Sequence, residues 1–334
     1  MRITGKLFVS LLCAAVFALP SFAQGRIGII GLDTSHSIAF TKIVNSDQAT
    51  YAPYKVVAAY PRGSYVIESA YSRIPKYTEE MKGYGVKITS SIEEMLDMVD
   101  CVLLETNDGH LHLEQAAKVF KAGKKIYIDK PIGATLAQAI AIYTLAERYG
   151  ITFFSSSVVR FSEKNQRIRA GEFGKIIAAD CYSPHHATPT HPDFGYYGLH
   201  GVEELYTVMG PGCDYVSRVH TDEGDIVSGV WKDGRTGSFR AIRKGPSIYG
   251  GTAFTEKKAI STGGVSNGYK PLVDAIIGFF KTGVCPIDKE ETLEIFTFME
   301  ASNESVKQNG KAVSLAPIRK KAEKEAQKLL KQYK

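Results

Sequence analysis

Three features that define large classes of proteins are scarce in this sequence. Beyond residue 23, no segment approaches the roughly 20 apolar residues that a membrane-spanning helix requires. Five cysteines in 334 residues, with no Cys-x-x-Cys pair, are too few for a disulfide framework. Without Arg2 and Lys6 the formal net charge falls from +6 to +4, an excess too small to favour a nucleic acid or a membrane surface. We therefore expect neither as a partner.

The first 23 residues have the three parts of a secretory signal peptide. Arg2 and Lys6 give a positively charged start, residues 7–19 are apolar, and residues 21–23 form a small-x-small cleavage site. We expect cleavage before Gln24 and an exported protein in the periplasm.

Residues 24–155 and 156–334 differ in pattern, which together with the chain length indicates two domains. In the first, apolar runs alternate with amphipathic stretches, as in the βαβ units of a parallel sheet. This pattern predicts a Rossmann-type doubly wound domain. The expected strands are residues 26–31, 55–60, 100–105, 125–128 and 151–155, and the expected helices are residues 37–45, 112–122 and 136–149, with another capped by Ser90 or Ser91 and Glu93 or Glu94.

The second domain has the pattern of an α+β domain with a large, mainly antiparallel sheet. A turn at Asp233-Gly234 separates two of its strands. We expect a helix over residues 289–308 and a basic, solvated helix over residues 319–334, which could pack back on the first domain. The expected strands are residues 176–182, 216–220, 226–231 and 237–242.

The turn after the first strand only partly matches a dinucleotide-binding fingerprint, which would place glycine at positions 31, 33 and 36. Gly31 is present, but Asp33 and His36 occupy the other two positions. Thr34 and Ser35 could donate hydroxyl hydrogen bonds to a phosphate at the start of the following helix, although a carboxylate at position 33 would repel it. Alternatively, Asp33 or Ser35 caps this helix and His36 fills space.

The second strand ends without the carboxylate that usually holds the adenosine ribose. Arg62 and Ser64 follow this strand instead and would suit a 2′-phosphate, so NADP is as open as NAD. Arg62 is equally compatible with an exposed turn residue.

The strongest motifs lie in residues 106–116, 122–125 and 129–131. Their order and spacing resemble the glucose-fructose oxidoreductase and inositol dehydrogenase family (Gfo/Idh/MocA), whose members have a Thr-Pro-Asn-x-x-His stretch and a Glu-Lys-Pro motif there. Here the second motif is Asp129-Lys130-Pro131. The resemblance covers nearly all of the mature chain, through further matches at residues 159–161, 171–174, 198–203 and 300–302.

The resemblance implies a Rossmann domain that binds NAD or NADP, and a substrate domain whose sheet could pair in a homo-oligomer. It also implies that the cofactor contacts the turn after the first strand, the end of the second strand and the later motifs. The cofactor-binding residues that we expect are Gly31, Asp33, Thr34, Ser35, His36, Arg62, Thr106, Asn107, His112, Asp129 and Lys130.

By the same resemblance, Lys130 lies between nicotinamide and substrate and orients the reacting hydroxyl, while His200 acts as acid or base. A histidine titrates near neutrality and can accept and return the proton that accompanies oxidation of a hydroxyl. Many members have an aspartate four residues before this histidine, but here the position is Tyr196, followed by Tyr197. The aspartate-assisted relay is therefore missing, and either tyrosine could supply a hydroxyl or stack on a sugar face.

Four histidines within 16 residues raise the question of a metal site. No fixed-spacing motif such as His-Glu-x-x-His is present, and three prolines make the segment an irregular loop, so we predict no metal site. We expect this loop to contact a hydroxyl-rich substrate. The histidines are His185, His186, His191 and His200, and the expected substrate residues are Arg160, His185, His186, Tyr196, Tyr197 and His200.

Arg160 has two interpretations: it holds an anionic substrate group, or it pairs with an internal carboxylate between the domains. The sequence as a whole predicts an exported NAD- or NADP-dependent oxidoreductase acting on a carbohydrate or polyol hydroxyl. Because free cofactor is scarce outside the cytoplasm, it would have to hold and recycle its cofactor. Alternatives are an exported carbohydrate-binding protein that has lost the cofactor, a metal-dependent hydrolase or lyase, and a glycosidase acting through transient oxidation.

Overall fold

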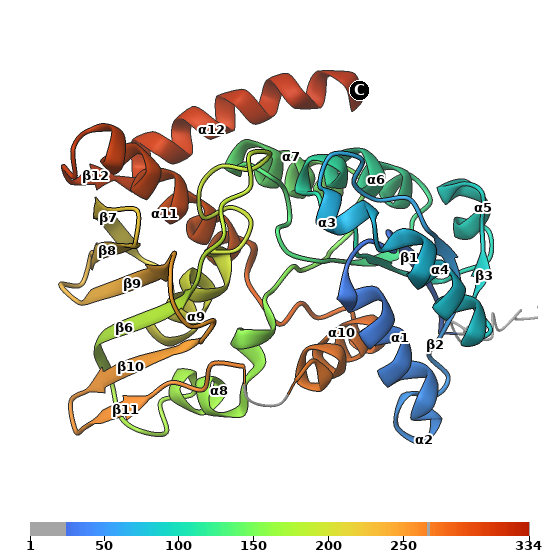
Figure 1. Cartoon of the computed structure of the whole chain (residues 1–334), viewed down its shortest axis with the longest axis horizontal. Coiled ribbons are helices and arrows are strands. Elements are labelled where there is room, and N and C mark those ends of the chain that lie inside the picture. Colours follow the sequence, from blue (N-terminus) through green and yellow to red (C-terminus); the bar gives the residue numbers. More distant parts are fainter. Residues whose placement is uncertain (1–24, 266–267, 334) are drawn as a thin grey trace, which may run out of the picture.

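A computed structural model describes residues 25–265 and 268–333, so the expected signal peptide lies outside the described residues. Two sheets, each with its own helices, make up this part of the chain (Figure 1). Among its helices, none is both long enough and apolar enough to cross a membrane.

The first sheet is parallel, with the strand order β3-β2-β1-β4-β5, and confirms the expected Rossmann-type domain. Strands β1 and β4 are almost wholly buried, as expected for a sheet with helices on both faces. The chain order reverses between them, and ligands of such sheets bind at the carboxyl ends of the strands near this point. The strands are β1 (Arg26–Ile30), β2 (Lys55–Tyr60), β3 (Lys87–Ile88), β4 (Cys101–Leu104) and β5 (Lys125–Ile128). The helices are α1 (Ser35–Ser46), α2 (Gln48–Tyr51), α3 (Glu68–Tyr71), α4 (Ile74–Gly83), α5 (Ile92–Leu96), α6 (Gly109–Lys121) and α7 (Leu136–Arg148).

One expected strand is wrong. Residues 151–155 run beside β5 with a single backbone hydrogen bond, from Ile128 N to Phe154 O at 3.3 Å, and are not a strand. The backbone just beyond is bonded elsewhere, because the N–H of Ser157 donates to Glu203 at 2.9 Å. The chain then enters the short helix η1 (Val158–Phe161).

The second sheet has the order β11-β10-β6-β9-β8-β7-β12, and neighbouring strands are antiparallel except for the parallel pair β6 and β9. The expected mainly antiparallel sheet is thus confirmed. Helices α9 and α11 pack against it. The strands are β6 (Ile176–Pro184), β7 (Cys213–His220), β8 (Gly224–Trp231), β9 (Thr236–Ile242), β10 (Gly250–Thr255), β11 (Ala259–Ser261) and β12 (Val313–Ser314), and the helices of this half are α8 (Glu163–Arg169), α9 (Leu199–Met209), α10 (Lys270–Thr282), α11 (Lys289–Lys307), α12 (Leu315–Leu329) and η2 (Leu330–Tyr333).

Two late helices return to the first domain. Helix α10 packs on α1, where Leu272 and Ile276 join a core that includes Ile27 and Phe40. Helix α12 packs on α7 and runs across the top of Figure 1. It buries Ala322 on its inner side. The two domains therefore share packed helices as well as the chain segment that joins them.

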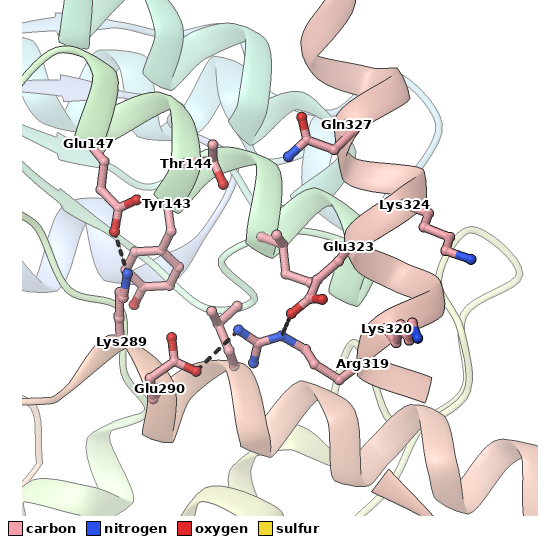
Figure 2. Close-up of a pocket in the computed structure, with 12 residues that line it drawn as sticks. Tyr143, Thr144, Glu147, Lys289, Glu290, Arg319, Lys320, Glu323, Lys324 and Gln327 are labelled. Atoms are coloured by element: carbon pink, nitrogen blue, oxygen red, sulfur yellow. Dashed lines mark hydrogen bonds and ion pairs between the residues drawn. The ribbon is translucent and has the colours of Figure 1, made fainter. Parts of the chain in front are cut away.

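A hollow of about 470 Å³ lies among α7, α11 and α12 (Figure 2). Ion pairs cross between its walls: Arg319 of α12 contacts Glu290 at 3.1 Å, and Lys289 pairs with Glu147 of α7. These ion pairs link the three helices. It shares no lining residue with the cavity described next.

Candidate active site

A cavity of about 490 Å³ lies between the carboxyl ends of β1, β4 and β5 and the second domain. Residues from both domains line it, so the site exists only when the domains are together. Nine of its lining residues were predicted from the sequence: Thr34, Ser35, His36, Asn107, Lys130, His186, Tyr196, Tyr197 and His200. Six others were not part of the predicted site: Ser69, Arg73, Val158, Tyr249, Val265 and Tyr269.

The start of α1 forms one wall of this cavity. Thr34 is the N-cap, and its side-chain oxygen accepts a hydrogen bond from the N–H of His36 at 3.4 Å. Ser35 is exposed, and the first turn carries no acidic side chain. Backbone N–H groups and the helix dipole make such an end favourable for an anionic group.

Asp33 connects neighbouring loops and does not line the cavity. Its buried carboxylate accepts hydrogen bonds from the N–H of Ser64 at 2.7 Å and of Asn107 at 3.0 Å. Burial, opposed by these bonds, raises the pKa of Asp33 to about 6. A Cβ at Gly63 would lie only 2.1 Å from Asp33 Oδ2, so the chain can pass there only with glycine. Asp33 thus holds together the loops that follow β1, β2 and β4.

His36 occupies the place of a fingerprint glycine and links α1 to the end of β5. Its Nδ1 lies 2.8 Å from Asp129 Oδ2, and its ring stacks on Phe40. Burial alone would raise the pKa of Asp129, but His36 and Lys130 lower it to about 2. Glu105 lies beside this pair with no exposed surface, and burial and the Asp129 charge keep its pKa well above the usual value. The surroundings therefore favour the ionised form of Asp129 and disfavour ionisation of Glu105.

His200 faces the cavity from the first turn of α9. Its Nδ1 lies 2.6 Å from Ser157 Oγ, and the backbone N–H of Ser157 is in turn held by Glu203. Burial and the charge of Lys130 lower the pKa of His200 well below 6.5, so the imidazole is neutral at pH 7. With its proton on Nδ1, the ring presents a lone pair on Nε2.

Tyr196 and Tyr197 both line the cavity, but they have different partners. The Tyr196 hydroxyl donates a hydrogen bond to Asn107 Oδ1, across the boundary between the domains. The Tyr197 ring lies 5.4 Å from the His200 ring, and the Tyr249 ring lies 5.9 Å from His200 on another side. The histidine is thus enclosed by aromatic rings.

Arg160 is engaged inside the protein and does not line the cavity. Its side chain is 3% exposed, Nε lies 2.8 Å from Glu203 Oε1, and Nη1 lies 2.6 Å from Glu291 Oε1. Two carboxylates therefore satisfy this guanidinium. The structure supports the pairing with internal carboxylates and places Arg160 outside the cavity lining, so it does not support the expected substrate contact.

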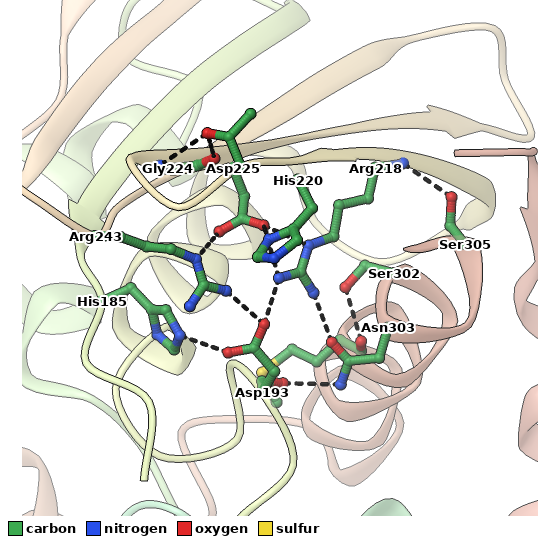
Figure 3. Close-up of polar contacts among 12 residues, drawn as sticks. His185, Asp193, Arg218, His220, Gly224, Asp225, Arg243, Ser302, Asn303 and Ser305 are labelled. Atoms are coloured by element: carbon green, nitrogen blue, oxygen red, sulfur yellow. Dashed lines mark hydrogen bonds and ion pairs between the residues drawn. The ribbon is translucent and has the colours of Figure 1, made fainter. Parts of the chain in front are cut away.

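His185 is likewise turned away from the cavity, although it was expected to contact substrate. Figure 3 shows it in a network of charged side chains at one end of the second sheet. Its Nε2 lies 2.6 Å from Asp193 Oδ1, and Asp193 also pairs with Arg218 and with Arg243. Asp225, on β8, pairs with the same two arginines. This network anchors the loop between β6 and α9, so His185 has a structural position.

The other predicted cofactor residues support the site from outside its lining. His112 is buried, and its two ring nitrogens lie 2.6 Å from the carbonyl oxygen of Thr106 and 3.2 Å from that of Ile132. Gly31 has φ +91°, and a Cβ there would lie 2.6 Å from Thr106 Oγ1. Arg62 is exposed and donates to the Tyr65 hydroxyl at 3.2 Å.

The unpredicted lining residues come from segments without a recognisable pattern. Ser69 lies in the one-turn helix α3, and Arg73 is the N-cap residue of α4. Tyr269 precedes α10 and reaches the site only because α10 packs back on α1. Residues 65–73 contain no motif or periodicity, so no sequence signal would have identified the first two.

The cavity has a charge pattern that fits the phosphate groups of a nicotinamide cofactor. Arg73 and Lys130 line it together with the N-terminus of α1, and no lining residue is a carboxylate. Its volume also lies within the roughly 300–1,000 Å³ typical of small-molecule sites. The fit is less complete at the end of β2, where Arg62 lies outside the lining.

Residues 25–157 match the model of the oxidoreductase family with an NAD-binding Rossmann fold, GFO_IDH_MocA. The uncharacterized oxidoreductase YhhX of Escherichia coli (strain K12) is 28% identical over 163 residues, which cover 45% of this chain and 47% of that protein. An uncharacterized oxidoreductase of Streptococcus pneumoniae is 29% identical over 99 residues, covering 28% of this chain and 27% of that protein. The chain thus matches less than half the length of each curated relative.

Solved structures share the fold over most of the chain. The scyllo-inositol dehydrogenase from Lactobacillus casei with bound NAD(H) and scyllo-inositol has a TM-score of 0.69 at 16% identity, covering 87% of this chain and 99% of its own. The WlbA dehydrogenase from Bordetella pertussis in complex with NADH and UDP-GlcNAcA has a TM-score of 0.69 at 17% identity, covering 86% and 98%. At such identities, the likeness establishes the fold.

Proposed function

This chain belongs, through its N-terminal domain, to the Gfo/Idh/MocA oxidoreductase family, and we propose that it is an NAD- or NADP-dependent oxidoreductase acting on a hydroxyl of a carbohydrate or polyol. The observation that carries the proposal is the cavity lining. Lys130 and His200, one from each domain, share a cavity with the N-terminus of α1 and Arg73. Structural relatives bound to scyllo-inositol and to UDP-GlcNAcA support a hydroxyl-rich substrate.

In this proposal, Thr34, Ser35 and Arg73 hold the cofactor phosphates, and Lys130 and Asn107 lie toward the reacting end. A bound nicotinamide supplies the acceptor for the hydrogen and electron pair of the substrate C–H bond. The protein has to remove the hydroxyl proton and stabilise the developing charge on oxygen.

His200 is suited to remove that proton. Because burial and Lys130 lower its pKa, the imidazole is neutral and its Nε2 can accept the proton. Ser157 fixes the ring through Nδ1. The Lys130 ammonium, held beside the ionised Asp129, would stabilise the negative charge that develops on the substrate oxygen.

Substrate recognition would fall to the loop before α9 and to Tyr249. His186, Tyr196 and Tyr197 line the cavity from this loop, and their hydroxyl and imidazole groups can bond to substrate hydroxyls while the rings pack on a sugar face. These groups select hydroxyl-rich molecules as a class.

We further propose that the protein is exported to the periplasm and keeps its cofactor through successive turnovers. The apolar residues 7–19 and the small residues at 21 and 23 motivate export. Little free nicotinamide cofactor is present outside the cytoplasm, so a second sugar would have to reoxidise or reduce the bound cofactor. One sugar would therefore be oxidised and another reduced in turn by the same bound cofactor.

One alternative rests on a specific observation. Asp33 and His36 fill two of the three fingerprint glycine positions with side chains that bond to neighbouring loops and to Asp129. If these side chains close the cofactor path, the same cavity would serve an exported carbohydrate-binding protein.

The deciding experiment is a spectrum and mass analysis of the ligand released when the purified protein is denatured. Released NAD or NADP supports the oxidoreductase and identifies the cofactor. If none is released and neither added nucleotide binds, the oxidoreductase proposal is wrong and the binding protein takes its place.

Replacing Lys130 with Met should abolish turnover and leave cofactor binding unchanged. Unchanged turnover would remove Lys130 from the mechanism.

We also propose that the second sheet pairs in a homo-oligomer. Ile177 of β6 and Val219 of β7 are 51% and 65% exposed, so pairing of two sheets would remove apolar side chains from water. Light scattering after size-exclusion chromatography should give a mass of at least two chains, and a Val219→Asp variant should shift it toward one.

A further inference from the structure

Three side chains able to ligate a metal ion meet beside the cavity, outside its lining: Asp108, His110 and His191. The first two lie at the start of α6, and His191 lies in the loop between β6 and α9. One ligand atom from each lies within 4.8 Å of the others. The neighbouring Asn107 and Tyr196 do line the cavity, and the rings of Tyr196 and His191 are 5.3 Å apart.

The Nε2 atom of His191 has no hydrogen-bond partner among the described residues, although its side chain is 0% exposed. It points toward Asp108 Oδ1 at 3.6 Å, a separation too long for a hydrogen bond. On the other side of the ring, Nδ1 lies 2.9 Å from Thr190 Oγ1. A buried nitrogen is therefore aimed at a carboxylate without being bonded to it.

The two facing atoms are both acceptors. When Nδ1 carries the proton and donates to Thr190, Nε2 presents a lone pair toward the Asp108 carboxylate. A lone pair and an anionic oxygen repel each other unless a cation lies between them.

We propose that Asp108, His110 and His191 bind a Zn²⁺ ion. Bonds of about 2.0–2.1 Å in a tetrahedral site place donor atoms about 3.3 Å apart. Here Asp108 Oδ1 lies 3.6 Å from His191 Nε2 and 2.9 Å from His110 Nδ1, so small side-chain movements complete the geometry. Three protein ligands leave a fourth position open, and the His110 side chain, 43% exposed, gives access from solvent.

A second group of potential ligands carries no such inference. His36, Glu105 and Asp129 also lie within 4.8 Å of one another. However, their side chains are at most 8% exposed, whereas the side chain of His110 is 43% exposed. The second group therefore lacks the access from solvent that His110 gives to the first.

The Asp108–His110–His191 site joins the two domains. The ion would fasten the loop that carries Tyr196 and Tyr197 to the start of α6, and so fix one wall of the cavity. Sequence reasoning predicted no metal because it considered only the histidines of the loop, whereas two of these three ligands follow β4. The inference does not depend on the proposed oxidoreductase activity.

The test uses purified protein without a histidine tag, stripped with a chelator and dialysed. Titration with ZnCl₂ followed by calorimetry, with elemental analysis after a second dialysis, should give one Zn²⁺ per chain. Co²⁺ in its place should show the visible absorption of a tetrahedral site. Failure to bind Zn²⁺ above a background of weak, non-stoichiometric uptake would overturn the proposal. Nicotinamide binding is measured separately, so failure of either proposal is distinguishable.

The variant His110→Ala is the primary test because this exposed side chain can be removed without disturbing the fold. Loss of a bonded ligand should weaken Zn²⁺ binding by at least the roughly 10- to 100-fold that outer-shell changes cost. His191→Ala should do the same. His186→Ala, from the same loop but outside the group, should bind Zn²⁺ as the parent does. Equal affinity in the parent, His110→Ala and His191→Ala would place the metal elsewhere and refute the assignment.

Discussion

Asp33 illustrates how a single side chain can change the meaning of a turn. Glycine at this position normally lets a cofactor approach the backbone. The Asp33 carboxylate instead takes the N–H groups of Ser64 and Asn107, and its pKa is raised to about 6. Compared with the glycine fingerprint, Asp33 is a mismatch. In the structure, however, its side chain connects the loops that follow β1, β2 and β4.

This burial makes a prediction for stability. The folded-state pKa of Asp33, about 6, exceeds the ordinary aspartate value of 3.8, so its contribution is fully present only below pH 3.8 and is lost as the pH rises through 6. Asp33→Asn cannot ionise. The free energy of unfolding of this variant, relative to the parent, should therefore improve by about 2 kcal/mol between pH 4 and pH 7. Urea unfolding at both pH values measures it, and a constant difference would contradict the buried carboxylate.

His200 makes a residue-scale prediction for activity. Its lowered pKa keeps the imidazole neutral, so the rate of hydroxyl oxidation should stay level from pH 8 to 6.5 and fall only at lower pH. His200→Asn should lose about 10²–10⁴-fold in turnover above pH 6.5, because the amide cannot accept the proton, and the loss should shrink at lower pH. The pH profile of turnover measures both effects. A parent rate already falling above pH 6.5 would show that His200 is not the base.

At the scale of elements, the sequence predicted strands and caps well where the pattern is local. The strand over residues 55–60 is found as expected, and Ser91 caps α5 while Glu94 reaches back to the N–H of Ser90. The strand predicted over residues 151–155 was wrong because an apolar run does not show whether its N–H groups will bond to a neighbouring strand. The short helices α3 and α4, which bring Arg73 to the site, have too few residues to establish a period.

A prediction at the scale of elements concerns Arg73, the N-cap residue of α4. It is exposed, lines the cavity and begins α4, so its removal should leave the fold intact. We expect Arg73→Ala to weaken binding of both NAD and NADP by about tenfold, because a cation near the phosphates is lost. Arg62→Ala is the matched control: it should weaken NADP alone if Arg62 holds the 2′-phosphate, and neither cofactor if it is a turn residue. Fluorescence titration with each cofactor measures the four affinities, and unchanged affinities in Arg73→Ala would contradict the phosphate assignment.

At the scale of the molecule, the site depends on contacts that no local pattern specifies. Lys130 could be selected from its motif, but the residues that line the cavity with it come from α3 and the N-cap of α4, from the loop before α9 and from the segment before α10. Arg160 shows the same limit. From the sequence, Arg160 could either bind a substrate anion or pair with an internal carboxylate. Only the packing of α9 and α11 around it brings Glu203 and Glu291 to the guanidinium and decides between the two.

The Arg160 ion pairs give a prediction for the whole molecule. Arg160→Leu would leave two carboxylates buried without their partner, which should cost about 3–5 kcal/mol in the free energy of unfolding. Glu291 keeps a second partner, Arg169 at 2.6 Å, so the lower end of this range is expected. The exposed pair of Arg167 with Glu172 is the control, since Arg167→Ala should cost less than about 1 kcal/mol. Urea unfolding measures both. If Arg160→Leu were as stable as the parent yet lost affinity for substrate, Arg160 would belong to the substrate site rather than to the packing inside the second domain.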